Sequence, residues 1–247
     1  MTAAPVARAP GTAAAAGRIA GIDALRGLAV IAMVAFHFCF DLAHFGVIAA
    51  NFYRDAFWLH ARTAILSSFL LLAGVSLVLA QRTAQGRAGF WRHVATIAAC
   101  ALLVTAATFV AFPQSYVTFG VLHAIALCLV LLRPLVARPW LALALGVAVI
   151  AAGNAFTATA FDGPPWGFVG FATVKPRTED YVPLFPWAGV MLAGIALGHA
   201  LLRHDFRAVA PFGILPRFVR WLGRHSLLVY MLHQPLLFGA LWLAVGR

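Results

Sequence analysis

The sequence predicts an all-α, polytopic transmembrane helix bundle of about seven helices. Of the 247 residues, 63% are hydrophobic and only 10% are charged, and the mean hydropathy is +0.92. Because about a quarter of the residues in a soluble domain are charged, this composition is typical of an integral membrane protein. Apolar segments follow one another with no polar stretch long enough for a soluble domain, which favours a single bundle over residues 18–247.

Apolar runs and their breaks place the expected helices. A membrane-spanning helix needs about 20 mainly apolar residues, and proline tends to end it. Residues 157–180, rich in Gly, Pro and aromatic residues, are expected to form an ordered cover over one mouth of the bundle. Residues 203–224 are a basic, partly amphipathic connector, expected at the membrane interface. The expected helices are 18–48, 61–81, 90–112, 116–132, 139–156, 181–202 and a last helix that begins near Leu222.

The basic residues orient this bundle. Cytoplasmic loops of membrane proteins carry an excess of Lys and Arg. With seven alternating helices, all but five of the 18 Lys and Arg residues fall on the side of the N-terminus. We therefore expect the N-terminus in the cytoplasm and the C-terminus outside. The five exceptions are Arg54, Arg62, Lys175, Arg177 and Arg247.

Several classes of function are excluded by the pattern of residues. The formal charge of +11 sits at segment ends, without the aromatic-interleaved basic patch of a nucleic-acid protein, so we expect no nucleic acid. Cys39, Cys100 and Cys128 lie in apolar segments without metal-ligand spacing, so neither a disulfide framework nor a metal site is expected. Residues 1–17 lack the apolar core of a signal peptide and are expected to be a disordered cytosolic tail.

One face of the first expected helix is polar. At about 100° per residue, its charged and imidazole side chains fall within an arc of roughly 60°. Ionisable groups in hydrocarbon are costly, so such a stripe usually faces a protein interior or a water-filled cavity and indicates a functional site. The members of the stripe are Asp23, Arg26, His37, Asp41 and His44.

His37 and Asp41 are one helical turn apart in this stripe. A carboxylate at that spacing can accept a ring N–H, fix the imidazole tautomer and raise its basicity. The pair suits a general base, or a histidine that carries a transient acyl group. The alternative is a His–Asp pair that only holds helices together. His44 shares the face and either binds the acceptor or simply sits at the interface.

The stretch DALRGLAVIAMVAFHFCFDLAHFG resembles the first helix of the bacterial family grouped with the catalytic domain of heparan-alpha-glucosaminide N-acetyltransferase. Its opening, Asp-x-x-Arg-Gly followed by a histidine, is also similar to the membrane O-acyltransferases of acyltransferase type three. The resemblance implies an acyl-CoA donor, with acetyl-CoA as the expected one, on the cytoplasmic side of a bacterial inner membrane. It also implies a sugar amine or hydroxyl acceptor on the other side. In the animal lysosomal members the essential histidine lies just beyond the position of His37, so His37, His44 and His60 remain rival counterparts.

Near the cytoplasmic end of the same helix, Asp23, Arg26 and Gly27 form the expected cofactor-binding group. Arg26 can contact a phosphate or the pantetheine of an acyl carrier, and Gly27 lets a cofactor or helix approach closely. The alternative is an Asp23–Arg26 ion pair that anchors the helix end.

Two later helices complete the predicted site. The segment GVLHAIAL resembles a helix of the same family and contributes His123, expected to be catalytic or structural. The last helix resembles the family's final Ser-Leu-x-x-Tyr-x-x-His-Gln-Pro segment and lines the site. Its expected catalytic residue is His233, and its expected substrate-binding residues are Ser226, Tyr230 and Gln234.

The sequence thus predicts a membrane acyltransferase that moves an acyl group, expected to be acetyl, to an amine or hydroxyl of an envelope glycan or lipid. The other hypotheses are a small proton-coupled transporter, in which the His/Asp stripe forms a relay, and an accessory membrane protein. The bilayer and acyl-CoA are its expected partners, and a homo-oligomer remains open.

Overall fold

The computed structural model describes residues 18–82, 86–163 and 165–246, and over these ranges the chain is all-α, with no strand. The expected tail, residues 1–17, lies outside the described residues. Short 3-10 turns separate the longer elements. The α-helices are α1 (Ala20–His44), α2 (Ala56–Ala80), α3 (Gly86–Ala111), α4 (Val121–Leu132), α5 (Pro139–Ala155), α6 (Leu184–Arg203), α7 (Arg217–Arg224) and α8 (Ser226–Val245).

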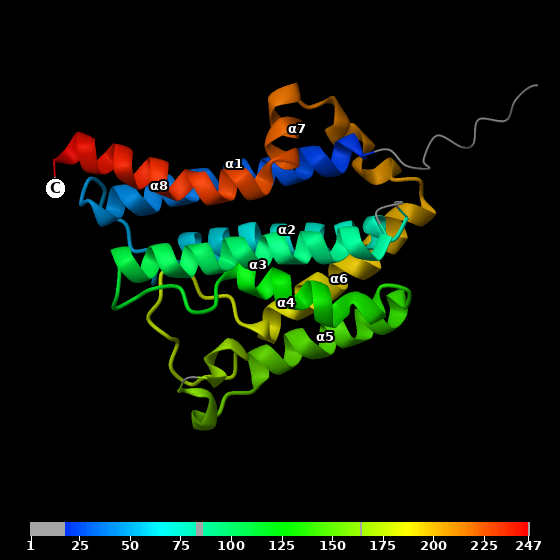
Figure 1. Ribbon diagram of the computed structural model, residues 1–247, viewed down its shortest axis with the longest axis horizontal. Helices are drawn as coiled ribbons and strands as arrows, with labels where there is room; N and C mark the ends of the chain where they lie inside the picture. The colour runs from blue at the N-terminus through cyan, green and yellow to red at the C-terminus, as the bar shows by residue number, and fades with distance from the viewer. Residues whose placement is uncertain (1–17, 83–85, 164, 247) are drawn as a thin grey trace, which may run out of the picture.

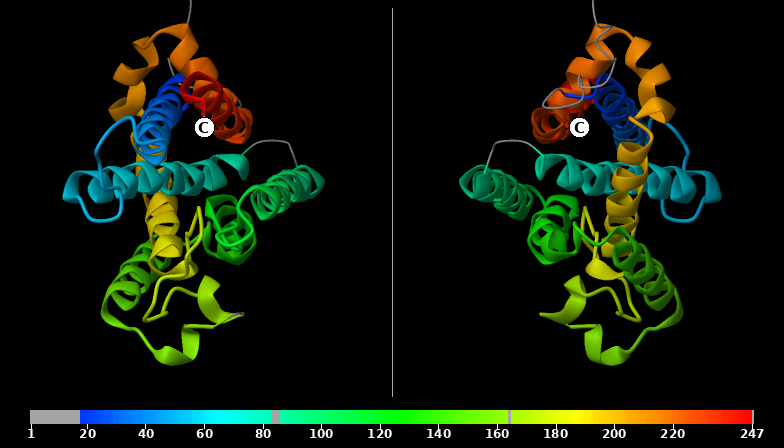
Figure 2. Two further views of the ribbon diagram at one scale, coloured as in Figure 1. Left: turned by 90° about the vertical axis from the view of Figure 1, so that its left-hand side faces the viewer. Right: turned by 90° about the vertical axis from the view of Figure 1, so that its right-hand side faces the viewer.

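The apolar helices run side by side along the long axis of the molecule, with successive helices pointing in opposite directions (Figure 1). The first and last helices lie together, because α8 lies beside α1 and the short helix α7 packs across the start of α1. Seen along the helices, α1, α7 and α8 are grouped on one side and α4 and α5 on the other, with α2 between them (Figure 2). The first and last segments therefore form one layer of the bundle.

Five of the described helices, α1, α2, α3, α6 and α8, are long and apolar enough to cross a membrane. The helices α4 and α5 are apolar but shorter. The all-α class and a multi-pass membrane protein are therefore established, whereas seven crossings and the orientation of the termini stay predictions.

The expected boundary of the fourth helix was wrong by several residues. Its α-helical turns begin at Val121 rather than near residue 116. The preceding backbone is held instead by threonines of α3: the Thr105 hydroxyl donates to the Val117 carbonyl at 2.7 Å, and Val117 N–H donates to Thr108 Oγ1 at 3.0 Å. These bonds compete with the helix for the same backbone groups, so the chain turns before it becomes helical.

The connector and the last helix also differ from expectation. Residues 207–214 form a 3-10 helix and α7 is a separate α-helix, so the last helix begins at Ser226 and not near Leu222. The break falls at His225, whose backbone (φ −109°, ψ 25°) is not α-helical. In the described part of the expected loop, residues 157–163 and 165–180, the chain forms two 3-10 turns, Thr159–Phe161 and Trp166–Phe168. The neighbouring Tyr181 hydroxyl donates a hydrogen bond to the Gly167 carbonyl at 2.6 Å.

Glycines bring α2 and α6 into backbone contact. A Cβ on Gly74 would lie 2.2 Å from the carbonyl oxygen of Met191, and one on Gly194 would lie 2.3 Å from that of Leu71. Small residues at helix crossings permit this close approach in membrane proteins. The crossing fixes α2, whose other face carries side chains of the site described below.

We expect Gly74→Ala to destabilise the fold by about 1–3 kcal/mol, because the new methyl meets backbone that cannot move aside cheaply. Gly239→Ala in α8 is the matched control, since a Cβ there meets nothing within 4 Å. Thermal unfolding in detergent, followed by circular dichroism, measures both variants. Equal midpoints for the two would contradict the assignment of Gly74 to a tight crossing.

Candidate functional site

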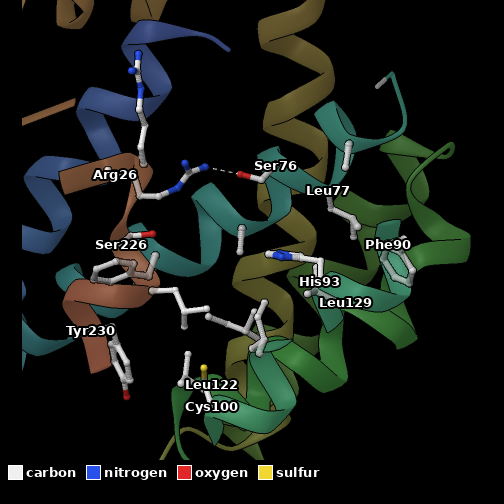
Figure 3. A pocket seen from close by; sticks show the side chains of 18 of the residues that line it. Arg26, Ser76, Leu77, Phe90, His93, Cys100, Leu122, Leu129, Ser226 and Tyr230 are labelled. Atoms are coloured by element: carbon white, nitrogen blue, oxygen red, sulfur yellow. Dashed lines mark hydrogen bonds between the residues drawn. The ribbon is translucent and has the colours of Figure 1, made fainter. Parts of the chain in front are cut away.

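A cavity of about 1080 Å³ lies between α1, α2, α3, α4 and the start of α8. Figure 3 shows Arg26 and Ser76 near one end of the view and Leu122 and Cys100 near the other. Most of its wall is apolar, with side chains such as Phe69, Leu77 and Ile97. Ligand pockets in proteins usually measure about 300–1,000 Å³, so this cavity is large enough for an extended ligand.

The polar part of the wall is strongly basic. Among the described residues that line the cavity, none is acidic. Guanidinium groups are well suited to phosphate recognition because they are always charged and offer a fork of N–H donors. The cationic or imidazole side chains of this wall are Arg18, Arg26, Arg87, His93, Arg133, Arg224 and His225.

Arg26 is the one member of the expected cofactor-binding group that lines the cavity. Its Nη2 donates a hydrogen bond to Ser76 Oγ of α2 at 2.7 Å (Figure 3), and its Nη1 lies 3.6 Å from Asp23 Oδ1. The structure thus places beside the guanidinium a hydroxyl that lies 50 residues away in the sequence.

The other two members, Asp23 and Gly27, hold α7 against α1. Asp23 is only 4% exposed, and its Oδ2 accepts a hydrogen bond from Arg224 Nε at 2.9 Å. A Cβ on Gly27 would lie 1.9 Å from the carbonyl oxygen of Val219, so only glycine permits this approach. Through this packing Arg224 is fixed on the cavity wall.

Tyr230 lines the cavity, as does Ser226. The Tyr230 hydroxyl lies 3.5 Å from Asp180 Oδ2, and the same oxygen accepts the Val121 N–H at 2.7 Å. Asp180 thereby caps the start of α4. Sequence reasoning did not single out Asp180, because a carboxylate just before a helix carries no signal of a partner 50 residues away.

A second polar group, which we call the seam cluster, consists of His37 and Asp41 on α1 with His233 and Gln234 on α8. Gln234 Nε2 donates to Asp41 Oδ1 at 2.7 Å, and the rings of His37 and His233 are 4.9 Å apart. Asp41 is 1% and His233 8% exposed. Among the described residues, no hydrogen bond joins His37 to Asp41, so the expected His–Asp orientation is replaced by the Gln234–Asp41 bond.

His123 and His44 belong to neither group, although His44 lies one turn from Asp41 on α1 and interacts with its carboxylate. His123 Nδ1 accepts the Gly120 N–H at 3.3 Å and its Nε2 lies 3.3 Å from Thr105 Oγ1, so both ring nitrogens serve the turn before α4. His44 packs on Phe238 of α8, with ring centroids 5.5 Å apart. Neither residue lines the cavity.

Of the predicted site residues, the structure thus brings Arg26, Ser226 and Tyr230 to the cavity. It brings His37, Asp41, His233 and Gln234 to the seam cluster, whereas Asp23, Gly27, His44 and His123 belong to neither group. The two groups are adjacent: Tyr230 is on the cavity wall and its ring centroid lies 5.6 Å from that of His233. Among the described residues no group of His, Cys, Asp and Glu is arranged to hold a metal ion.

Comparison with known proteins gives one result. The family model described as "Heparan-alpha-glucosaminide N-acetyltransferase, catalytic" matches residues 18–235. No curated protein and no solved structure matches the chain.

The Asp180 carboxyl makes the stability of this region depend on pH. Burial raises its pKa above the ordinary value of 3.8, although the Val121 N–H and Tyr230 act in the opposite direction. The folded state therefore binds this proton more tightly than the unfolded state. The stability that the protonated carboxyl contributes is lost as the pH rises through the folded-state pKa. We expect the melting temperature of Asp180→Asn, relative to wild type, to increase as the pH is raised from 4 to 8.

Asp162→Asn is the control, because the pH dependence of its stability relative to wild type is expected to have the opposite sign. Hydrogen bonds from Thr173 lower the pKa of Asp162, so wild type is favoured over this variant at higher pH and loses that advantage in acid. Parallel pH profiles for the two variants would contradict the assignment for Asp180.

Proposed function

The chain belongs to the family of heparan-alpha-glucosaminide N-acetyltransferase catalytic domains, and from this premise we propose that it transfers an acyl group from acyl-CoA to an amine or hydroxyl. The family supports an acetyltransferase in general. Acetyl-CoA is the simplest donor, and an envelope glycan or lipid is the acceptor class in this proposal.

The observation that carries the proposal is the cavity itself. Acyl-CoA is a 3′-phosphorylated adenosine diphosphate joined to a flexible pantetheine chain that ends in the thioester. The arginines of the wall suit the phosphates, and the apolar part of the wall, with Leu122, Cys100 and Met231, suits the chain. In this pose the thioester reaches the part of the wall formed by Tyr230.

The arrangement also gives the two substrates separate approaches. Arg18 and Arg87 lie at the end where α1 and α3 begin, which the distribution of basic residues predicts to be cytoplasmic. The seam cluster lies beyond Tyr230 along α1 and α8, toward the opposite end. A donor entering from the cytoplasm and an acceptor from the envelope would meet between them.

A second candidate function is a proton-coupled carrier in the same membrane. It is favoured by the seam cluster, where buried imidazole and carboxylate groups share one helix interface as they do in proton relays. It differs from the acyltransferase in a measurable way, since it moves protons and consumes no thioester.

We expect the purified protein to release free thiol from acetyl-CoA when envelope extract is supplied as acceptor. Arg87→Gln should raise the KM for acetyl-CoA about fivefold, because removing one exposed phosphate contact costs about 1 kcal/mol. Thiol release and transfer of radiolabelled acetyl into the extract are the measurements. The matched control is Arg82→Gln, since Arg82 is also exposed but lies outside the cavity, and its KM should stay within about twofold of wild type.

Absence of thioester consumption by well-folded wild type, together with pH-driven uptake into proteoliposomes, would replace the acyltransferase by the carrier. Equal KM values for the two arginine variants would show that the phosphates bind elsewhere.

Donor binding can be read independently of turnover through Cys100, which lies on the cavity wall. In a variant that keeps only this cysteine, acetyl-CoA at ten times its Kd should slow alkylation by N-ethylmaleimide roughly tenfold, because the ligand covers the thiol. A variant that keeps only Cys39, which does not line the cavity, is the control and should react at an unchanged rate. An equal effect of acetyl-CoA on the alkylation rates of Cys100 and Cys39 would contradict donor binding in this cavity.

A further inference from the structure

The seam cluster contains polar atoms that the fold leaves unused. Buried polar groups in proteins nearly always have a hydrogen-bond partner, and each exception calls for an explanation. Among the described residues, four buried side-chain atoms have none: His37 Nδ1, Asp41 Oδ2, His233 Nε2 and Gln234 Oε1. All four belong to the same interface between α1 and α8.

Hydrogen-bond roles identify what is missing. A carbonyl oxygen can only accept, so the contact between His233 Nδ1 and the Tyr230 carbonyl, at 2.6 Å, makes Nδ1 the donor. The neutral ring then carries its lone pair on Nε2. Asp41 Oδ2 and Gln234 Oε1 are acceptors too, the latter because the Gln234 amide nitrogen already donates to Asp41. Three of the four unused atoms are acceptors, so the group that completes the cluster is a hydrogen-bond donor.

The fixed tautomer distinguishes His233 from His37. The Tyr230 carbonyl accepts the Nδ1–H and so fixes the orientation of the His233 ring, while the buried Nε2 has no hydrogen-bond partner among the described residues. No hydrogen bond among the described residues fixes the tautomer of His37, since Asp41 is held by Gln234. The sequence-based choice of His37 as base rested on an interaction with Asp41 that the tertiary structure assigns to another residue.

Position also favours His233. The Tyr230 side chain lines the cavity, and the centroid of its ring lies 5.6 Å from that of the His233 ring. The groups that face His233 are His37 and Asp41 from α1, Tyr230 and Gln234 from its own helix, and Asp180 beyond the Tyr230 hydroxyl. None of these is a fixed positive charge.

We propose that His233 Nε2 is the general base that accepts the proton of the acyl acceptor, at a site completed by Asp41 and Gln234. This inference rests on the proposed acyltransferase function. The acceptor's amine or hydroxyl donates into the seam cluster and attacks the thioester carbonyl carbon. The new N–C or O–C bond forms and the C–S bond breaks. The acceptor's proton passes to Nε2 and from there to the departing sulfur, so free coenzyme A thiol leaves and the ring returns to its neutral form.

The test is His233→Asn, because the asparagine amide can still donate to the Tyr230 carbonyl but provides no base. General base catalysis contributes about 10²–10⁴-fold, so kcat should fall by that factor. The acid limb of the wild-type pH–rate profile, where the base is protonated, should disappear. Protection of Cys100 by acetyl-CoA should be unchanged, since the donor cavity is intact.

Two other histidine variants provide the comparison. His37→Asn should reduce kcat less and retain the acid limb. His204→Asn, at an exposed position after α6, should match wild type. Tyr230→Phe should also retain the acid limb, because the bond that orients His233 goes to the backbone carbonyl. Elution of each variant as a monodisperse species in size-exclusion chromatography establishes folding, and His233→Gln replaces His233→Asn if the latter aggregates.

The inference is overturned if His37→Asn abolishes the acid limb while His233→Asn keeps it. It is overturned equally if radiolabelled acetyl remains on His233 after denaturation, because the ring would then be a nucleophile and not a base. Both results leave thioester turnover and Cys100 protection in wild type intact. If the protein is not an acyltransferase, wild type shows neither thioester turnover nor Cys100 protection, so this result differs from a failure of the inference about His233.

Discussion

The need to give partners to polar side chains on a membrane-buried helix governs this structure. Helix α1 carries two carboxylates that are almost fully buried, and each takes a hydrogen-bond donor from a helix near the other end of the chain. Asp23 binds Arg224 and Asp41 binds Gln234, across sequence separations of 201 and 193 residues. An uncompensated carboxylate in an apolar interior is very costly, so these two bonds hold the C-terminal helices on α1.

The position of α7 and α8 has a direct consequence for the site. With α8 beside α1, the start of α8 faces α2, α3 and α4 across the cavity, and α7 adds Arg224 to the basic wall. Gly27 and Gly223 permit this contact, since a Cβ on Gly223 would lie 1.8 Å from the carbonyl oxygen of Asp23. The same packing that satisfies the buried charges therefore shapes the place where a phosphate-bearing ligand fits.

Tyr230 connects the two halves of the proposed reaction. Its ring forms cavity wall, its hydroxyl points to Asp180, and its backbone carbonyl orients His233. A single residue thus touches the proposed donor site and fixes the proposed base. Pro235 follows shortly afterwards within α8, where it removes one backbone donor from the helix.

How far the site was predictable differs from residue to residue. The one-face arrangement of His37 and Asp41 follows from helical periodicity, and both residues lie together in the seam cluster. The spacing of Tyr230 and His233 likewise predicts one helix face for both residues, and their ring centroids lie 5.6 Å apart in the structure. Asp180 and the roles of Asp23 and Gly27 were not predictable, because each depends on a residue brought near by the fold.

The sequence by itself determined the all-α membrane class, the family and the polar face of α1. These follow from composition, helical periodicity and motifs, which are local properties of the chain. The tertiary structure alone decided which polar groups became partners. Hydrogen bonds between side chains depend on distances of a few tenths of an ångström between helices far apart in sequence. For this reason Asp41 is bonded to Gln234 of α8 rather than to His37, one turn away on its own helix.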